Sequence, residues 1–397
     1  MRILHVMPTF LLDGGYLPAV IPLSRNLEKL GHSVEIVSGE DVKKRFFDGV
    51  RTFPLSMPKS WNRSPLLDDW LKNNVGSFDI LHLHGLWDYP QFRAAWYAIK
   101  KNIPYIVTPH GIFLEPHRYN SMKKKLYLYL IGNRILNSAR TIHVTSDLEL
   151  EGCKLAGIRK PIVKIPWGID FSEFSTKQEP QYAENLWPIL AGRRILLFMS
   201  RLSPEKGLDQ LLLALSSVKD QHKKILLVIA GEEDKKYRHK SILDNIIERH
   251  NLKQYVFFAG LVKGAAKLAL LKRADIFVMP SYGENFSFAV AEALACGVPV
   301  ITTTKTPWHE IQDISAGRVV APEASALRDA INELLSLPTE ELKEMGLRGR
   351  KLIDQRYDWI SISHKFEKLY LNICEKEQNI RCINNPSSER RDTFLDV

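Results

Sequence analysis

The stretch MPSYGENFSFAVAEALACGVP, residues 279–299, decides the fold expected for the second half of this sequence. A short apolar run ends at Pro280 and a polar loop follows. A helical pattern then starts near Ser287 and ends at Gly297, ahead of Pro299. Glycine and proline after such a pattern are typical of a helix C-terminus. The stretch therefore predicts a strand, a loop and a helix, the repeating unit of a parallel α/β sheet.

Short β-rich runs alternate with helical patterns on both sides of this stretch. The strands expected in the second half are residues 195–199, 225–230, 256–259, 276–279, 300–303 and 318–320. Those expected in the first half are residues 2–7, 33–38, 80–84, 105–108, 141–145 and 163–165. The clearest helical pattern, residues 18–30, ends at Gly31 as glycine-capped helices do. The alternation predicts parallel sheets joined by crossover helices.

The pattern is interrupted at residues 171–193, which carry Pro180, Pro188 and Gly192. With 397 residues and about 150 residues per domain, we expect two Rossmann-like domains, at 1–175 and 190–358. A last helix over about 359–376 is expected to pack back on the first domain. The polar residues 377–397 are expected to form a flexible tail.

Composition excludes several classes of protein. Hydrophobic residues at 45% and charged residues at 25% are ordinary for a globular chain. The four cysteines stand far apart without Cys-x-x-Cys spacing, which argues against a disulfide scaffold or a zinc site. The N-terminus runs into a strand pattern without a signal sequence, and no apolar stretch reaches about 18 residues. We expect a cytoplasmic protein, soluble or peripheral to the membrane, with no nucleic-acid partner.

The net charge of +10 is unevenly distributed. Between Arg93 and Arg140 there are nine Lys/Arg against one acid, Glu115. This excess indicates a solvated basic face, an anionic membrane surface or an anionic acceptor. Within it, the lysines at 123–125 precede the apolar residues 126–131, an order that suits an interfacial helix, although core packing of the apolar part is an equal alternative.

Two carboxylates lie in the opening stretch, Glu284 in the loop and Glu292 on the helix. Residues eight apart on a helix would be about 80° apart in direction. Glu284 therefore fits better ahead of the helix, and Glu292 two turns inside it. Carboxylates accept hydrogen bonds from sugar and ribose hydroxyls. Because Glu292 stands among apolar residues, we expect a bound ribose or a cation beside it.

Two other loops follow strands, at the edge where parallel sheets bind ligands. Arg201 and Lys206 follow the strand at 195–199 and suit a diphosphate, although a solvated loop is equally consistent with them. Gly14 and Gly15 follow the first strand and would let backbone N–H groups approach a phosphate, although paired glycines more often form a turn. Neither loop is a Gly-x-Gly-x-x-Gly fingerprint or a P-loop.

Together these motifs closely resemble family 4 of the retaining glycosyltransferases. That family has the GT-B fold, two Rossmann-like α/β domains with parallel sheets facing across a cleft. The resemblance rests on the Glu-x7-Glu pair and the Ala-Leu-Ala-Cys-Gly-Val-Pro-Val around its second member, with Arg201 and Lys206 upstream. It covers most of the chain from Met1 to about Ile373 and includes residues 14–15, 31–34, 168–170 and 257–262.

The resemblance implies a nucleotide diphosphate sugar donor in the cleft, held mainly by the second domain. It implies diphosphate contacts from Arg201 and Lys206, ribose contacts from Glu292 and sugar contacts from Glu284. A backbone N–H of the Gly14–Gly15 loop would approach the phosphate. His110, after the strand at 105–108, matches the family's active-site histidine near the sugar, so the implied catalytic residues are His110, Glu284, Arg201 and Lys206.

The sequence departs from the family at one position of the donor loop. The family's Gly-Phe-Gly after the first glutamate is Asn285-Phe286-Ser287 here. We expect all three residues to line the donor site, with side chains at 285 and 287 that crowd the sugar pocket.

No Asp-x-Asp motif occurs in the chain, so we expect no metal and no cofactor. Arg201, Lys206 and the helix N-terminus near Ser287 would stabilise the leaving diphosphate. By resemblance, the reaction retains anomeric configuration through front-face attack, in which the leaving phosphate oxygen takes the acceptor proton. No protein nucleophile is then needed.

The acceptor side has fewer signals. His84 and Trp87 follow the strand at 80–84 and are candidate acceptor contacts. His82 and His84 share one face of that strand and would suit a metal, but the sequence shows no third ligand.

The function expected is transfer of a hexose to a glycan or lipid-linked acceptor, in synthesis of a surface polysaccharide, lipopolysaccharide or glycolipid. A phosphorylase, a sugar-nucleotide epimerase and a non-catalytic nucleotide-sugar-binding protein are the alternatives. The Glu-x7-Glu segment argues against the first two, and the joint presence of the expected site residues argues against the third.

Overall fold

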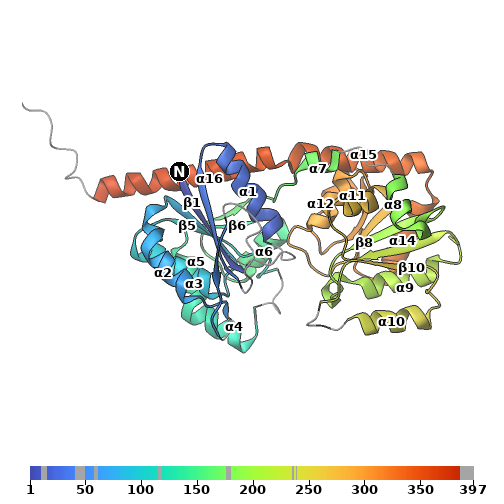
Figure 1. Ribbon diagram of the computed structural model, residues 1–397, viewed down its shortest axis with the longest axis horizontal. Helices are drawn as coiled ribbons and strands as arrows, with labels where there is room; N and C mark the ends of the chain where they lie inside the picture. The colour runs from blue at the N-terminus through green and yellow to red at the C-terminus, as the bar shows by residue number, and fades with distance from the viewer. Residues whose placement is uncertain are drawn as a thin grey trace, which may run out of the picture. The chain divides into compact units, whose positions relative to one another are not determined.

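The computed structural model describes residues 1–9, 16–40, 50–57, 61–114, 119–175, 180–234, 237 and 239–384. The chain divides into two compact units. The first unit consists of Met1–Thr145, Leu150–Ile165 and Ile360–Val397, and the second of Ser146–Glu149 and Pro166–Trp359. Figure 1 shows that each unit is built on one sheet flanked by helices.

The first unit contains a seven-stranded parallel sheet in the order β3-β2-β1-β4-β5-β6-β7. Its strands are β1 (Arg2–Thr9), β2 (Ser33–Glu40), β3 (Val50–Pro54), β4 (Ile80–His84), β5 (Tyr105–Thr108), β6 (Thr141–Val144) and β7 (Ile162–Lys164). Its helices are α1 (Leu17–Lys29), α2 (Pro65–Asn74), α3 (Tyr89–Lys100), α4 (Met122–Tyr127) and α5 (Asn133–Ser138), with a π-helical turn at Leu128–Gly132. Helix α6 (Asp147–Leu155) begins in the second unit and ends in the first.

The centre of this sheet is the pair β1 and β4, where the strand order reverses. Every residue of β4 is buried, as expected for a parallel strand covered on both faces. In the register of the pair, His5 lies opposite His82. Since ligands bind at the carboxyl ends of strands beside such a reversal, the loops after β1 and β4 lie where a site is expected.

The second unit contains a six-stranded sheet in the order β10-β9-β8-β11-β12-β13, in which all neighbouring strands are also parallel. Its strands are β8 (Arg194–Met199), β9 (Ile225–Ala230), β10 (Val256–Gly260), β11 (Ile276–Met279), β12 (Val300–Thr303) and β13 (Gly317–Val320). Its helices are α7 (Phe171–Ser175), α8 (Pro180–Leu186), α9 (Leu208–Val218), α10 (Lys240–Arg249), α11 (Gly264–Arg273), α12 (Phe288–Ala295), α13 (Glu310–Asp313), α14 (Ala324–Ser336) and α15 (Thr339–Arg356). The reversal falls between β8 and β11, the strands that precede the two loops singled out in the sequence.

The sequence prediction of the strands is confirmed except for β3, which it missed. The other strands agree with the expected ranges to within about two residues. Strand β3 is an edge strand that pairs only with β2, and only its first residue is buried. An edge strand without a buried apolar face lacks the continuous hydrophobic run from which the other strands were recognised.

Helix α16 (Trp359–Asn384) is longer than the sequence prediction, which ended it near residue 376. Its buried side chains Ile362, Phe366 and Tyr370 belong to its first half. The expected tail therefore begins inside a helix, because there is no glycine or proline between Trp359 and Pro386 and because Glu377 forms an ion pair with Arg140 at 2.6 Å. Residues 385–397 lie outside the described part of the chain.

Candidate functional site

In the second unit, the loop after β8 packs directly on the loop after β11. The backbone N–H of Tyr282 donates to the carbonyl of Glu205 at 2.9 Å. Gly207, with φ of +66°, approaches Pro280 so closely that a Cβ on it would lie 2.1 Å from the Pro280 carbonyl oxygen. Only glycine fits this contact, and the contact places Lys206 beside the β11 loop.

Lys206 and Glu284 form the centre of this site. The Lys206 ammonium lies 2.7 Å from Oε1 of Glu284, and the hydroxyl of Ser281 donates to the same oxygen at 2.7 Å. The Glu284 residue is 9% exposed. Thr303 in turn donates its hydroxyl to the carbonyl of Ser281 at 2.6 Å, which ties the loop to β12. The sequence assigned these two residues to different parts of the donor, and the structure brings them into direct contact.

Glu292 has a cation beside it, one of the two partners, a bound ribose or a cation, that its apolar surroundings predicted. The ammonium of Lys267, on α11, lies 2.6 Å from Oε1 of Glu292 on α12. The side chains are 30% and 16% exposed. The sequence alone gives no sign of Lys267 as this partner. Lys267 stands 25 residues before Glu292 on a different helix, and no local spacing connects the two residues.

Arg201 forms two ion pairs that involve neither Glu284 nor Glu292. Its guanidinium donates to Asp234 at 2.7 Å and to Glu205 at 3.3 Å, and its side chain is 54% exposed. Exposed ion pairs of this kind contribute about 0–1 kcal/mol each to stability. Such pairs exchange readily when a stronger anion is offered.

The residues between Glu284 and α12 differ in burial. The side chain of Phe286 is 4% exposed and packs against Phe288, Trp308 and Tyr357, while Trp308 donates its ring N–H to the Phe286 carbonyl. Phe286 therefore anchors the loop to the core of the second unit. Asn285 is half-buried.

Ser287 adopts a backbone conformation that favours glycine. Its φ is +65° and its ψ 78°, and it stands at the N-cap of α12 without a capping hydrogen bond from its side chain. A side chain at positive φ costs about 1–2 kcal/mol relative to a right-handed conformation. The backbone geometry of the family's glycine is thus kept here with a serine, at the cost of strain.

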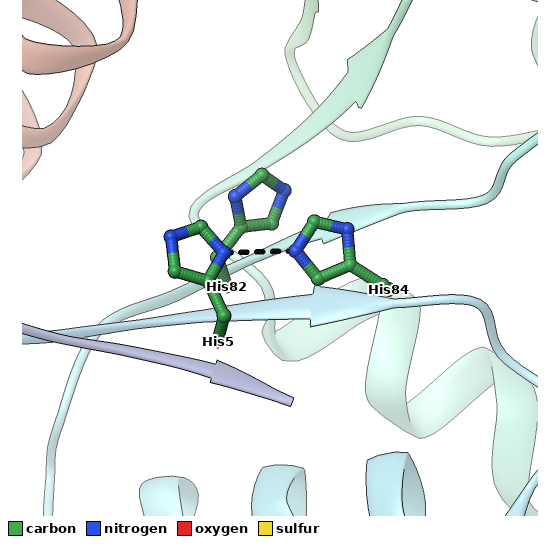
Figure 2. A group of neighbouring side chains, drawn as sticks. All are labelled: His5, His82 and His84. Carbon is green, nitrogen blue, oxygen red and sulfur yellow. Dashed lines mark hydrogen bonds between the residues drawn. The ribbon is translucent and has the colours of Figure 1, made fainter. Parts of the chain in front are cut away.

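Five histidines gather in and after the strands of the first unit's sheet, four of them buried and His110 half-buried. They are His5 on β1, His82 and His84 on β4, His110 after β5 and His143 on β6. Figure 2 shows the rings of His5, His82 and His84 close together, with His5 and His84 joined by a hydrogen bond. Their nearest ring nitrogens lie within 4.8 Å of one another. The sequence had shown no third partner for His82 and His84, and the structure supplies His5.

Burial keeps all five imidazoles neutral near pH 7. It lowers the pKa of His5 and of His110 to about 3 and that of His143 to about 4. The pKa values of His82 and His84 also lie well below 6.5, first because of burial and then because of the neighbouring histidines. A neutral imidazole has one N–H donor and one acceptor nitrogen, so its role is set by its tautomer.

The other residues expected in the first unit lie in different surroundings. His84 is completely buried, with Nε2 2.9 Å from His5 and Nδ1 3.0 Å from His110. Trp87 is half-buried, with the Tyr127 ring 5.5 Å away and the Lys124 ammonium 5.5 Å above its ring. Gly14 and Gly15 lie outside the described residues.

Comparison with known proteins identifies the class. The crystal structure of Anabaena Alr3699/HepE in complex with UDP and glucose superposes with a TM-score of 0.78 over 94% of this chain and 100% of that chain, at 18% identity. The predicted GT-B fold is therefore confirmed. The model of Glycosyltransferase Family 4 matches residues 19–173, and that of Glycosyl transferases group 1 matches residues 185–352. The chain belongs to the family 4 glycosyltransferases, which transfer a sugar from a nucleotide-sugar donor.

Two relatives match almost the whole chain. The phosphatidylinositol N-acetylglucosaminyltransferase gpi3 subunit of Schizosaccharomyces pombe is 29% identical over 395 residues, covering 94% of this chain and 80% of the relative. The phosphatidyl-myo-inositol mannosyltransferase of Mycobacterium leprae is 25% identical over 400 residues, covering 96% of this chain and 99% of the relative.

The strain at Ser287 predicts that Ser287→Gly raises the free energy of unfolding by about 0.5–1 kcal/mol, because glycine tolerates positive φ but loses more chain entropy on folding. Urea unfolding measures the change. Ser287→Ala is the matched control, since it keeps the Cβ that causes the strain and removes only the hydroxyl. A glycine variant no more stable than the alanine variant would contradict the interpretation.

The buried histidines predict a loss of stability in mild acid. In the unfolded chain they bind protons near pH 6.5. In the folded chain His5, His110 and His143 stay neutral to about pH 3–4, and the pKa values of His82 and His84 also lie well below 6.5. The unfolded state therefore binds more protons below pH 6.5, and each histidine lowers the free energy of unfolding by about 1.4 kcal/mol per pH unit there. Urea unfolding from pH 7.5 to 5.0 tests this before ordinary carboxyls titrate. A free energy of unfolding that does not change with pH would refute the prediction. His143→Gln should reduce the slope of this free energy against pH by the contribution of one histidine.

Proposed function

We propose that this protein transfers a hexose from a nucleotide diphosphate donor to a lipid-linked or glycan acceptor, with retention of anomeric configuration. The observation that carries the proposal is the contact of Lys206 with Glu284 beside the β8/β11 reversal. It combines a cation suited to a diphosphate with a carboxylate suited to sugar hydroxyls. Both groups are held in place before any ligand arrives.

The donor would be divided among these side chains. Lys206 and Arg201 bind the diphosphate, exchanging their present acidic partners for phosphate oxygens. Glu292 accepts hydrogen bonds from the ribose hydroxyls, with Lys267 holding its carboxylate in place. Glu284 accepts hydrogen bonds from the transferred sugar, while Ser281 fixes the orientation of its carboxylate.

The chemistry proposed is stabilisation of the leaving diphosphate. Preorganised cations and the N-terminus of α12 lower the energy of the charge that develops as the sugar–phosphate bond breaks. The acceptor hydroxyl attacks from the same face, and the leaving phosphate oxygen takes its proton. Glu284, oriented by the hydroxyl of Ser281, acts as a hydrogen-bond acceptor and not as a nucleophile. Neutral His110 acts through a hydrogen bond and not through charge.

A lipid-linked acceptor is supported by the two relatives named above, both of which carry an inositol phospholipid in their names. It is also supported by a surface of the first unit that we call the basic apolar face. Its apolar members are Met122, Leu126, Tyr129 and Leu130, which are 83%, 59%, 78% and 62% exposed. Their spacing of four, three and one residues places them on one side of a helix.

Lysines adjoin this apolar surface at positions 123–125, and those at 123 and 125 are exposed. Exposed apolar side chains beside cations suit an anionic bilayer surface. Leu128 and Ile131 pack against the core, so the alternative of core packing holds for them, whereas Leu126, Tyr129 and Leu130 are exposed. No helix in the described ranges has both the length and the hydropathy of a membrane span.

For the donor site, we expect Lys206→Met and Glu284→Gln each to reduce sugar transfer at least 100-fold, because each removes one preorganised contact to the transition state. A panel of UDP-, GDP- and ADP-linked hexoses is first screened by thermal shift, and turnover is then measured with the donor that stabilises the protein. Lys343→Met is the matched control, since Lys343 forms an exposed ion pair with Glu340. Unchanged turnover in both site variants would reject the proposal.

For the membrane surface, we expect the protein to float with vesicles that contain anionic phospholipid and not with neutral vesicles, with less binding at high salt. The double variant Leu126→Glu/Leu130→Glu should stay in the soluble fraction. The double control Leu155→Glu/Leu347→Glu adds the same charge at leucines that are 80% and 62% exposed elsewhere, and it should float like the parent protein. Binding that does not depend on anionic lipid would count against this surface.

A further inference from the structure

Three histidines of the first unit form a hydrogen-bonded chain that ends at His110. Nδ1 of His5 lies 2.9 Å from Nε2 of His84, and Nδ1 of His84 lies 3.0 Å from Nε2 of His110. His5 and His84 are completely buried. The chain thus leads from the interior of the sheet, at β1, to the histidine that the family resemblance places in the active site.

A metal is the first alternative for three converging imidazoles, but the distances favour hydrogen bonds. Two nitrogens that share a tetrahedral zinc at 2.0–2.1 Å would lie about 3.4 Å apart, whereas those of His5 and His84 lie 2.9 Å apart. The third imidazole, His82, already has hydroxyl partners at both nitrogens, Tyr370 at 2.7 Å and Thr108 at 2.6 Å.

The partners of His82 belong to a second chain in which every proton position is determined. Nε2 of His143 faces the carbonyl of Ile165 at 2.8 Å and must donate to it. Nδ1 of the neutral His143 ring must then accept from the hydroxyl of Thr108, at 2.7 Å. Thr108 therefore accepts from Nε2 of His82, and Nδ1 of His82 accepts from Tyr370 of α16. One carbonyl sets the tautomers of two rings.

The first chain has two consistent proton arrangements, because each neutral ring has one N–H. If His110 donates towards His84, His5 must carry its proton on Nε2. That nitrogen is buried without a hydrogen-bond partner among the described residues. In the opposite arrangement His5 donates to His84, His84 donates to His110, and the partnerless nitrogen of His5 carries no proton. Orphaned buried N–H groups are rarer than under-satisfied acceptors, so the second arrangement is favoured.

We propose that His5 and His84 are positioning residues that hold His110 in the tautomer with its proton on Nδ1. In this tautomer Nδ1 of His110 is a hydrogen-bond donor and Nε2 an acceptor, which fixes the kind of substrate atom that each side of the ring can bind. The backbone of His110, with φ of +54°, is another constraint of the kind found where a side chain is held for function. This inference rests on the proposed function for the role of His110, but the tautomer itself does not.

The test is nitrogen NMR of histidine-labelled protein, in which couplings from the ring carbons' hydrogens to the nitrogens report the tautomer of each imidazole. His110 is assigned by its loss in His110→Gln. We expect a protonated Nδ1 and a bare Nε2 for His110 in the parent protein. The opposite tautomer would overturn the proposal without the need for any variant.

A pair of variants of equal size then separates positioning from packing. Asparagine at position 5 restores an N–H donor near the place of Nδ1, whereas leucine does not. We expect His5→Leu to shift His110 towards the other tautomer and to lower kcat about tenfold with little change in the donor KM. We expect His5→Asn to keep the parent tautomer and most of the parent kcat. Equal effects of the two variants on tautomer and kcat would overturn the proposal.

Two further results separate this inference from its alternatives. Stoichiometric binding of added zinc that is lost in His5→Asn would establish a metal site in place of the hydrogen-bonded chain. A protonated Nδ1 on His110 in a protein that transfers no hexose from the donor panel would uphold the tautomer and reject the proposed function. Sugar transfer by a protein whose His110 has the opposite tautomer would uphold the proposed function and reject the proposed tautomer.

Discussion

The close approach of Gly207 to the carbonyl of Pro280 is the contact on which the second unit's site depends. Strands β8 and β11 are neighbours at the reversal of the sheet, so the loops that leave them compete for the same space. A residue without a side chain, at positive φ, lets one loop lie against the backbone of the other. Lys206, which precedes this glycine, thereby reaches Glu284 on the facing loop.

Because of that contact, the charges of the site balance one another before a donor is bound. Lys206 neutralises Glu284, Lys267 neutralises Glu292, and Arg201 bridges two acids. A lone carboxylate in such surroundings would be costly, and the paired arrangement avoids that cost. Donor binding is then an exchange of partners, in which phosphate and sugar oxygens take the place of protein groups.

The polar groups of the first unit differ from those of the second unit, because they are imidazoles that carry no charge. Four buried imidazoles and the half-buried His110 lie in and after β1, β4, β5 and β6, and desolvation keeps all five neutral. Neutral rings require that donors and acceptors alternate along each chain. One chain is fixed by a backbone carbonyl at Ile165, and the other by a nitrogen of His5 that has no partner in the part of the chain that the structure describes. The geometry of buried hydrogen bonds, not electrostatic repulsion, therefore determines which atoms the rings present.

The sequence by itself determined the two parallel α/β units, most of their strands and the loops that carry Glu284, Lys206 and Arg201, because apolar runs buried on both faces are visible as local patterns. It missed β3, an edge strand with little burial, and placed the end of α16 too early. It also predicted a bound ribose or a cation beside Glu292, but gave no sign that Lys267 is that cation. Only the tertiary structure decided which side chains meet: Lys206 with Glu284, Lys267 with Glu292, and His5 with His84. These partners are 78, 25 and 79 residues apart in the chain, and it is the order and register of the strands, with the packing of the helices, that brings them within hydrogen-bond distance.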